Sequence, residues 1–520
     1  MDTLSVFKGR IYDSLSDSDR KGALRTVQLI KEKKDGRIKG RTCVNGSRQR
    51  LYTAEEDASS PTVSTEALLL TAAIDAAEER FVATCDITGA FLKADMDDFV
   101  LIALYDKEID ALIQANEKYC KYIKTLKNGR RVLYLELIKA MYGCLKSARL
   151  FWDHLSNFLS KLGFVQNDYD LCVANKVFDG DPCTVAWHVD DLKISHKNES
   201  VIRSVIEQLE GEYGKMSVTT GSVHHYCGMT LIFENKSLKI DMKEYLRDTV
   251  NEFPEDCTKP TTPAATHLFE VNPDQDKLDT ATKQIFHTNV AKLLFVSKRG
   301  RPDIQVAIAF LSTRVIEPDK DDWKKLVRLM RYVNGTIDLV LTLSVFGFNA
   351  IKWWVDGSYA PHVDCKSHTG GTMSMGRGSI YSTSCKQKIN ARSSTEAELI
   401  AVNDVAGQIL WTRNFLNEQG YDIESSTIFQ DNKSAMLLEA NGVLSSSKRT
   451  KHINVRCYFL KDHVDRNEIH IVYCPTDSMI GDYFTKPLQG SKFVQFRDVI
   501  MGTKCFDSLT KERVEECASI

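Results

Sequence analysis

Apolar residues recur at helical spacing in several parts of the chain. Residues 65–80 (TEALLLTAAIDAAEER) and residues 148–162 each keep an apolar side, which predicts two helices. Residues 281–335 are predicted to be mostly helical, and the segment WKKLVRLMRYV within them is the clearest amphipathic helix. Each of these helices has one side suited to face a core.

Short apolar runs predict buried strands, and two of them end in acidic residues. The run FVATC is followed by Asp86, and TVAWHVDDLKISH predicts a hairpin whose strands meet at Asp190 and Asp191. A carboxylate at the end of a buried strand is costly unless its charge is compensated. A single one is usually a solvated turn residue, but two adjacent carboxylates repel each other, and a divalent cation relieves that repulsion. The Asp pair therefore points to a metal site.

A basic hairpin is predicted near the start of the chain. The segment VQLIKEKKDGRIKGRTCVNG reads as two strands around a turn at Asp35-Gly36. Between Arg20 and Arg50, eleven Lys and Arg residues face two Asp and Glu residues, a local balance of +9. The hairpin is either a solvated surface element or a finger over phosphates, with Lys39 and Arg41 on one face.

A second series of acids begins in a new strand-rich unit near NAIKWWVDGSYA, which contains Asp356. The spacing from Thr395 to Glu398 matches a capping box, so we expect a helix to begin there with Glu396 in its first turn. Taken alone, Glu396 is better explained by the helix dipole, Asp431 by a helix N-cap and Asp482 by a turn.

Composition excludes several classes of protein. The 520 residues are 43% hydrophobic and 27% charged, which is typical of globular proteins, and the length predicts three or four compact units. We find no run of 18 apolar residues and no apolar signal core at the start, so a membrane span and secretion are not expected. The 14 cysteines form no CxxC pair, which excludes common zinc-finger spacing and favours a reducing compartment. The net charge of −2 does not exclude nucleic acid, because charged patches act locally.

Four motifs occur in a fixed order: DITGAFLKADMDD, KAMYGCLKSARLFWDHL, FVQNDYDLCVAN and WHVDDLKISH. Together they resemble the reverse transcriptase of Ty1/copia-type retrotransposons. The resemblance implies that Asp86, Asp190 and Asp191 are the metal-binding carboxylates of a polymerase palm, with two Mg²⁺ ions. It implies that Phe91 is an aromatic gate favouring deoxynucleotides, and that Lys39 and Arg41 meet the triphosphate.

The same resemblance assigns further contacts and shows some departures. Tyr142, Gly143 and Lys146 match a segment that touches the nucleotide and template, and YCGMTL resembles a primer-contact turn. His188 stands where the family has an aromatic residue in its Y-V-D-D motif, and Arg149 stands where it has proline. Neither change replaces a metal ligand.

A second resemblance covers residues 350–490. The order of Asp356, SSTEAE, DNKSA, RTKHI and DYFTKPL resembles the ribonuclease H domain of copia-type elements. It implies that Asp356, Glu396, Asp431 and Asp482 hold two Mg²⁺ ions. Phosphate contact is implied for Arg449 and Lys451, whereas His452 either assists product release or is structural. The segment FVSKRGRPDI resembles the family's connection segment.

We therefore expect an α+β fold: a right-hand polymerase with fingers, palm and helical thumb/connection, followed by an α/β ribonuclease H-like domain. The Pro- and Thr-rich stretch FPEDCTKPTTPAATH marks a linker. The expected units are an N-terminal segment (1–19), fingers and palm (20–255), a linker with thumb/connection (256–345), a ribonuclease H-like domain (346–490) and a C-terminal tail (491–520).

The resemblance predicts an RNA-directed DNA polymerase with ribonuclease H activity, as the C-terminal part of a Pol polyprotein. The expected partners are an RNA template, a DNA primer, RNA–DNA hybrids and dNTPs, with no membrane. The expected location is a cytoplasmic virus-like particle, with the nucleus as a second compartment. Two alternatives stay open: a decayed relic that binds nucleic acid without polymerising, and a nuclease that keeps the palm only as a scaffold.

Overall fold

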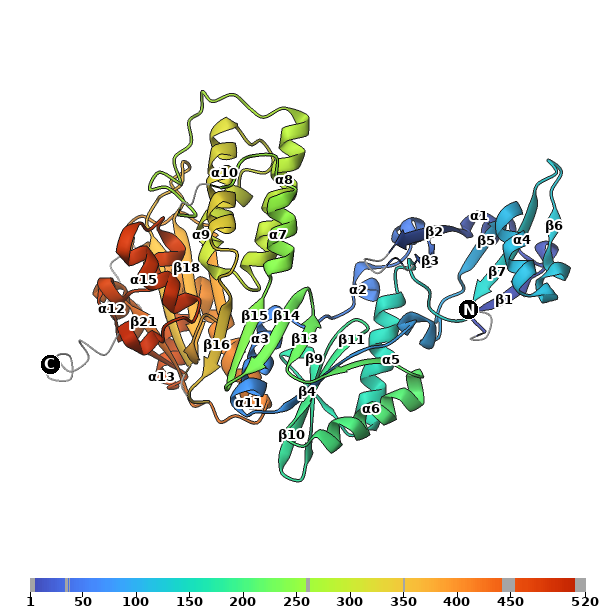
Figure 1. Cartoon of the computed structure of the whole chain (residues 1–520), viewed down its shortest axis with the longest axis horizontal. Helices are drawn as coiled ribbons and strands as arrows, with labels where there is room; N and C mark the ends of the chain where they lie inside the picture. Colours follow the sequence, from blue (N-terminus) through green and yellow to red (C-terminus); the bar gives the residue numbers. More distant parts are fainter. Residues whose placement is uncertain are drawn as a thin grey trace.

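The chain has three regions arranged along one long axis. A computed structural model describes residues 5–32, 36, 38–258, 262–348, 351–441 and 454–509. A small N-terminal unit lies at one end, a second sheet with helices lies in the middle, and the C-terminal unit lies at the other end (Figure 1). The architecture is the mixed α+β fold expected from the sequence.

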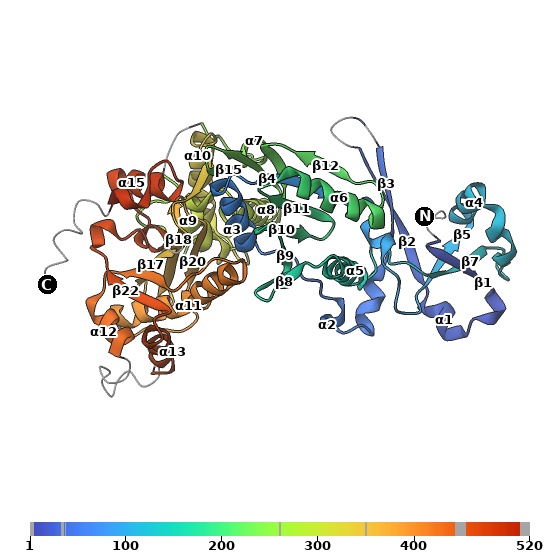
Figure 2. The same ribbon diagram turned by 90° about the horizontal axis from the view of Figure 1, so that it is seen from below.

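The N-terminal unit, the predicted fingers, is a sheet with the strand order β1-β7-β5-β2-β3, and β6 pairs with β7. Its strands are β1 (Phe7–Arg10), β2 (Leu24–Glu32), β3 (Ile38–Val44), β5 (Leu101–Tyr105), β6 (Lys124–Thr125) and β7 (Arg131–Leu137). Its helices are α1 (Asp17–Gly22), α2 (Glu55–Ala58) and α4 (Asp106–Ala115). The predicted basic hairpin is confirmed, because β2 and β3 pair antiparallel as a long ribbon (Figure 2).

The middle unit, the predicted palm, is a sheet with the strand order β12-β4-β11-β10-β9-β8. Its strands are β4 (Phe81–Asp86), β8 (Val165–Asn167), β9 (Asp170–Phe178), β10 (Asp181–His188), β11 (Asp191–His196) and β12 (Ser217–Thr220). Its helices are α3 (Thr65–Ala77), α5 (Ser147–Lys161) and α6 (Glu199–Tyr213). The predicted hairpin around Asp190 is confirmed.

Helix α3 differs from the expected one-sided helix. Every residue from Ala67 to Ala76 is buried, including Asp75. The helix packs against β15 (Ser237–Asp241) and β16 (Leu341–Val345), so it is covered by a neighbouring sheet. Asp75 is tolerated there because it forms an ion pair with the equally buried Lys193.

A third sheet joins the palm to the C-terminal unit, in the order β13-β14-β15-β16-β19. Its other strands are β13 (Val223–Tyr226), β14 (Met229–Glu234) and β19 (Gly376–Arg377). The helices of the predicted thumb and connection are α7 (Lys243–Asn251), α8 (Thr280–Ser297), α9 (Gln305–Ser312) and α10 (Lys320–Gly335). They stand together on one side of this sheet (Figure 1).

The C-terminal unit is a five-stranded sheet with the order β20-β18-β17-β21-β22. Its strands are β17 (Ile351–Ser358), β18 (His368–Ser374), β20 (Tyr381–Lys386), β21 (Ser426–Gln430) and β22 (Ile469–Tyr473). Its helices are α11 (Ser394–Glu418), α12 (Lys433–Asn441), α13 (Asn454–Asp465), α14 (Asp482–Thr485) and α15 (Gly490–Ile500). Strand β17 runs antiparallel to β18 but parallel to β21, so the carboxyl ends of β17 and β21 meet at one edge. Part of the expected polar tail is helix α15, which buries Phe493 and Phe496.

The C-terminal half of α11 docks on the palm. The Trp411 indole N–H donates to the Tyr169 carbonyl at 2.8 Å, and the Asn167 side-chain amide donates to the Phe415 carbonyl at 3.0 Å. The Tyr421 hydroxyl donates to the Glu78 carboxylate at 2.8 Å. The same α11 that carries acids at its start therefore holds the two units together at its end.

Candidate active sites

Three predicted carboxylates lie at one end of the palm sheet. Asp86 ends β4, Asp191 begins β11, and the two residues are register partners in this antiparallel pair. Asp190 lies in the two-residue turn between β10 and β11, where its carbonyl accepts a hydrogen bond from the Ile87 N–H at 3.0 Å. The sheet therefore brings together acids that are far apart in the sequence.

The turn that carries Asp190 has a strained backbone. Val189 has φ of +59°, a conformation that β-branched residues rarely adopt. The flanking pairing of His188 with Asp191 holds the turn closed. Strain of this kind persists only where surrounding structure enforces it, and it is common at functional sites.

The palm acids repel one another. Burial is the main cause that raises the pKa of Asp190, and the charge of Asp86 raises it further, while Arg41 and His188 lower it. Burial also raises the pKa of Asp191 above its ordinary value, followed by the charges of Asp190 and Asp86. The site is therefore short of positive charge when it holds no cation.

Rings and one guanidinium form a layer beside these acids. Phe91 lies in the 3₁₀ turn Ala90–Lys93, and its ring centroid is 4.6 Å from that of Tyr142. The Arg41 guanidinium lies 5.5 Å from the Tyr142 centroid. Burial, followed by the charge of Asp190, raises the pKa of Tyr142. Tyr142 thus contacts both Phe91 and Arg41, and all three residues are expected to meet the nucleotide.

The segment after Tyr142 is held by the fingers. Gly143 has φ of +93°, and a Cβ added there would lie 2.0 Å from the Val44 carbonyl oxygen of β3. Glycine is therefore required by the close approach of β3, a reason that differs from the ligand contact expected from the sequence. The Lys146 ammonium pairs with Asp98 at 2.7 Å, which raises its pKa.

Tyr226 supports the turn that carries Asp190 and was not among the predicted site residues. Its hydroxyl donates to the Asp191 carbonyl at 3.0 Å and approaches the Ala186 carbonyl at 3.3 Å. The residue is buried at the end of β13. The only sequence signal was its place in YCGMTL, which does not reveal a contact with β11.

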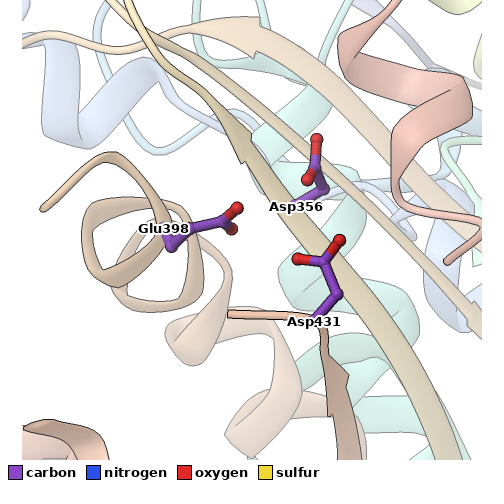
Figure 3. A group of neighbouring side chains, drawn as sticks. All are labelled: Asp356, Glu398 and Asp431. Carbon is purple, nitrogen blue, oxygen red and sulfur yellow. The ribbon is translucent and has the colours of Figure 1, made fainter. Parts of the chain in front are cut away.

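A second acidic group lies at the edge where β17 and β21 end. Asp356 comes from β17, Glu398 from α11 and Asp431 from the residue after β21, and their carboxylates point toward one another (Figure 3). One oxygen from each lies within 4.8 Å of the others. The predicted pairing of Asp356 with Asp431 is therefore present in space.

The glutamate of this group is Glu398, and the expected participation of Glu396 is corrected. Helix α11 is capped by Ser393, whose hydroxyl accepts the Glu396 N–H at 3.2 Å, and not by Thr395. The Glu396 carboxylate accepts the Arg392 N–H at 2.7 Å, so it closes the helix end. The two-residue difference in the cap exchanges the roles of the two glutamates.

Glu398 is held beside Asp356 by the neighbouring glycine. The Gly357 N–H donates to the Glu398 carboxylate at 2.8 Å. A Cβ on Gly357 would lie 2.4 Å from the Ala397 carbonyl oxygen, so only glycine lets α11 approach β17 this closely.

Asp482 adjoins the group through a lysine. The Asp482 carboxylate forms an ion pair with Lys486, whose ammonium also lies 3.6 Å from Asp356. Lys492 forms a second ion pair with Asp482, at 3.1 Å. The Thr485 hydroxyl donates to Asp356. Asp482 is thus linked to Asp356 through the Lys486 ammonium.

Burial sets the charge state of this second group. It raises the pKa of Asp356 to about 6, against the lowering effect of Lys486. Burial and the charges of Asp356 and Asp431 hold the pKa of Glu398 well above its ordinary value. Without a cation, burial and mutual repulsion therefore disfavour the ionised form of these two acids.

Four predicted contacts cannot be placed. Arg449, Lys451 and His452 lie outside the described residues, and the side chain of Lys39 does too. The backbone of Lys39 pairs with Lys31 in the β2–β3 ribbon.

The chemistry of both acidic groups suits a divalent cation, and in the second group one oxygen of each of Asp356, Glu398 and Asp431 lies within 4.8 Å of the others. Their donors are carboxylate oxygens alone, which hard divalent cations prefer. The raised pKa values of Asp190 and of Asp356 have burial as their main cause and neighbouring carboxylates as a further one, and a bound cation would remove that penalty.

The described part of the chain has a mixed α+β fold, with one group of acids at the end of the middle sheet and another at the edge of the C-terminal sheet. Residues 15–266 match the family described as "Reverse transcriptase (RNA-dependent DNA polymerase)". Over these residues the chain is similar to reverse transcriptases, and the relatives that it matches are Ty1/copia-type Pol polyproteins.

The relatives are long polyproteins. The "Retrovirus-related Pol polyprotein from transposon TNT 1-94" of Nicotiana tabacum is 25% identical over 512 residues, which are 95% of this chain and 37% of the relative. The "Transposon Ty1-MR1 Gag-Pol polyprotein" of Saccharomyces cerevisiae is 21% identical and covers 92% of this chain and 27% of the relative. The chain thus spans about a third of the length of these relatives.

A solved foamy viral protease-reverse transcriptase in complex with double-stranded DNA is similar at 10% identity and a TM-score of 0.48. The match covers 88% of this chain and 68% of the foamy viral chain.

Among the helices that the structure describes, none has the length and apolar character needed to cross a membrane.

Proposed function

We propose that this chain is the RNA-directed DNA polymerase of a copia-type retrotransposon. The observation that carries the proposal is the register pairing of Asp86 with Asp191, with Asp190 in the adjoining turn. These three carboxylates would hold two Mg²⁺ ions. When bound, the ions supply Lewis-acid activation of a primer 3′-hydroxyl and charge neutralisation at the leaving pyrophosphate.

The side chains around these acids would bind and select the nucleotide. Arg41 and Lys39 offer positive charge to the triphosphate. The Phe91 ring, supported by Tyr142, excludes a ribose 2′-hydroxyl. Gly143 and Lys146 complete the segment that lies along nucleotide and template.

A second activity, hydrolysis of the RNA strand in RNA–DNA hybrids, is proposed for the C-terminal domain. It is supported by the convergence of Asp356, Glu398 and Asp431, with Asp482 beside them. These residues would hold Mg²⁺ ions, which supply an activated water and stabilise the leaving 3′-oxygen. Arg449 and Lys451 are proposed to contact the hybrid backbone, and His452 is proposed to assist product release.

The partners follow from these activities: an RNA template, a DNA primer, RNA–DNA hybrid and dNTPs. We propose that residues 20–255 form fingers and palm, residues 256–345 linker and thumb/connection, and residues 346–490 the ribonuclease H-like domain. The proposed location is a cytoplasmic virus-like particle, with the nucleus as a second compartment.

Primer extension on an RNA template with Mg²⁺ tests the polymerase. We expect incorporation by the wild type, loss in Asp190→Asn, and retention in Asp179→Asn, a matched Asp in the exposed turn at the other end of β10. Absence of extension by the wild type would favour the decayed relic. The presence of His188 in place of the family's aromatic residue supports that alternative.

Cleavage of a labelled hybrid, measured in parallel, tests the second activity. We expect Asp356→Asn to abolish cleavage while extension persists. Cleavage by a wild type that cannot extend primers would favour a nuclease with the palm as a scaffold.

A further inference from the structure

Lys486 places a positive charge inside the second acidic group. Its ammonium forms an ion pair with Asp482 and lies 3.6 Å from the nearer oxygen of Asp356. Both carboxylates are buried, with exposed fractions of 1% for Asp356 and 2% for Asp482. The lysine side chain is 41% exposed, so its ammonium can leave for solvent without rearranging the core.

The ion pairs of Lys486 divide the group into two unequal halves, although its charge also acts on Glu398 and Asp431. Glu398 and Asp431 form no ion pair with Lys or Arg in the part of the chain that the structure describes. Glu398 is hydrogen-bonded by the Gly357 N–H, and Asp431 accepts the Thr476 hydroxyl at 3.0 Å. Asp356 takes part in both arrangements, because one of its oxygens lies within 4.8 Å of oxygens of Glu398 and Asp431, and its nearer oxygen lies 3.6 Å from the Lys486 ammonium that pairs with Asp482.

We infer that Lys486 is a built-in counter-ion that a divalent cation must displace from between Asp356 and Asp482. The half formed by Asp356, Glu398 and Asp431 then binds a first ion tightly, and the half with Asp482 binds a second ion weakly. The inference rests on the proposed ribonuclease H function and deepens it: occupancy of the second metal position is limited by the protein's own ammonium group. Lys486 is a positioning residue here, since it acts through the two carboxylates.

Titration of Mn²⁺ alone, followed by electron paramagnetic resonance of free Mn²⁺, tests this inference without any substrate. The full chain is used with Asp86 and Asp190 replaced by Asn, so that binding at the palm is suppressed. We expect two classes of site, and Lys486→Gln should tighten the weak class by about tenfold or more, because a positive charge next to it is removed. Lys486→Arg should leave the weak class weak. Lys461→Gln, which breaks a lysine–aspartate pair on α13, should change neither class.

The outcomes separate the two hypotheses. Two classes of site that Lys486→Gln leaves unchanged would overturn the inference but not the proposed function. Absence of Mn²⁺ binding that depends on Asp356 would overturn the proposed function itself. If Lys486→Gln melts early, Asp482→Asn decides: it should remove the weak class alone, and loss of the tight class would contradict the division into halves.

Discussion

The carboxylate of Glu398 accepts a hydrogen bond from the backbone N–H of Gly357 at 2.8 Å. Gly357 follows Asp356 on β17, so this contact aligns a helix residue with a strand residue at the point where both carboxylates must converge. The contact explains why one of two nearby glutamates joins the acidic group and the other does not.

Glu398→Gln should therefore impair hybrid cleavage, whereas Glu396→Gln should mainly lower stability. Glu398→Gln keeps the size of the side chain but removes a proposed metal ligand, so hybrid cleavage should fall by about 100-fold or more. Glu396→Gln should keep cleavage within about threefold and cost about 1 kcal/mol of stability by weakening the helix cap. Gel assays of hybrid cleavage and thermal melts check both; the reverse order would restore Glu396 as the ligand.

Gly357→Ala should disable the same site through the backbone. The new Cβ would meet the Ala397 carbonyl oxygen at 2.4 Å, so α11 must move away from β17. We expect a stability loss of about 1–3 kcal/mol and strongly reduced hybrid cleavage, with primer extension retained. Gly371→Ala, on the adjacent strand β18, is the matched control, because a Cβ there would come no closer than 3.4 Å to any neighbouring atom. Equal cleavage by both variants would show that the close approach is not required.

The palm acids could be predicted from the sequence only in part. The adjacent Asp190 and Asp191 point to a metal site by themselves, whereas Asp86 is assigned by the resemblance to reverse transcriptases, and its pairing with Asp191 depends on how β4 and β11 come together. The glutamate of the second group could not be assigned in the same way. Ser393 and Thr395 are both good N-caps, and the choice between them depends on how α11 packs on β17.

The burial of α3 and the role of Gly143 could not be predicted from the sequence either. Both depend on neighbours that are distant in the chain, namely β16 for α3 and Val44 for Gly143. Periodicity reports one apolar side, but it does not report a second sheet that covers the other side.

Phe91→Ala should weaken selection against ribonucleotides. The ring lies 4.6 Å from Tyr142 beside the palm acids, where an incoming sugar is proposed to bind. We expect the preference for dNTPs over NTPs to fall by about tenfold or more in single-nucleotide incorporation. Phe151→Leu, at a buried ring 6.2 Å from Phe91, should cost about 1 kcal/mol of stability and leave the preference unchanged. An unchanged preference in Phe91→Ala would remove the gate from the proposal.

Tyr226→Phe should slow polymerisation without weakening nucleotide binding. It removes the hydroxyl that donates to the Asp191 carbonyl at 3.0 Å, which loosens the strained turn. We expect kcat to fall several-fold with KM for dNTPs unchanged, and a stability loss of about 1–2 kcal/mol. Tyr332→Phe, which removes a buried hydroxyl bonded to Asp303 at 2.7 Å, should destabilise without lowering kcat. Similar kcat values in both variants would mean that Tyr226 is only structural.

Glu439→Gln should make stability less dependent on pH. Glu439 on α12 is fully buried, neither of its carboxylate oxygens has a hydrogen-bond partner in the described structure, and burial raises its pKa to about 8. Because the folded pKa lies above the unfolded one, the neutral acid stabilises the fold at low pH, and this contribution is lost as the pH rises through about 8. The amide is neutral at every pH, so the variant should match the wild type near pH 5 and exceed it by roughly 4 kcal/mol near pH 9. Melting curves at both pH values measure the difference, with Glu56→Gln at an exposed position of α2 as the control. If the difference in stability between wild type and Glu439→Gln stays constant from about pH 5 to about pH 9, the buried carboxyl is compensated by a nearby charge.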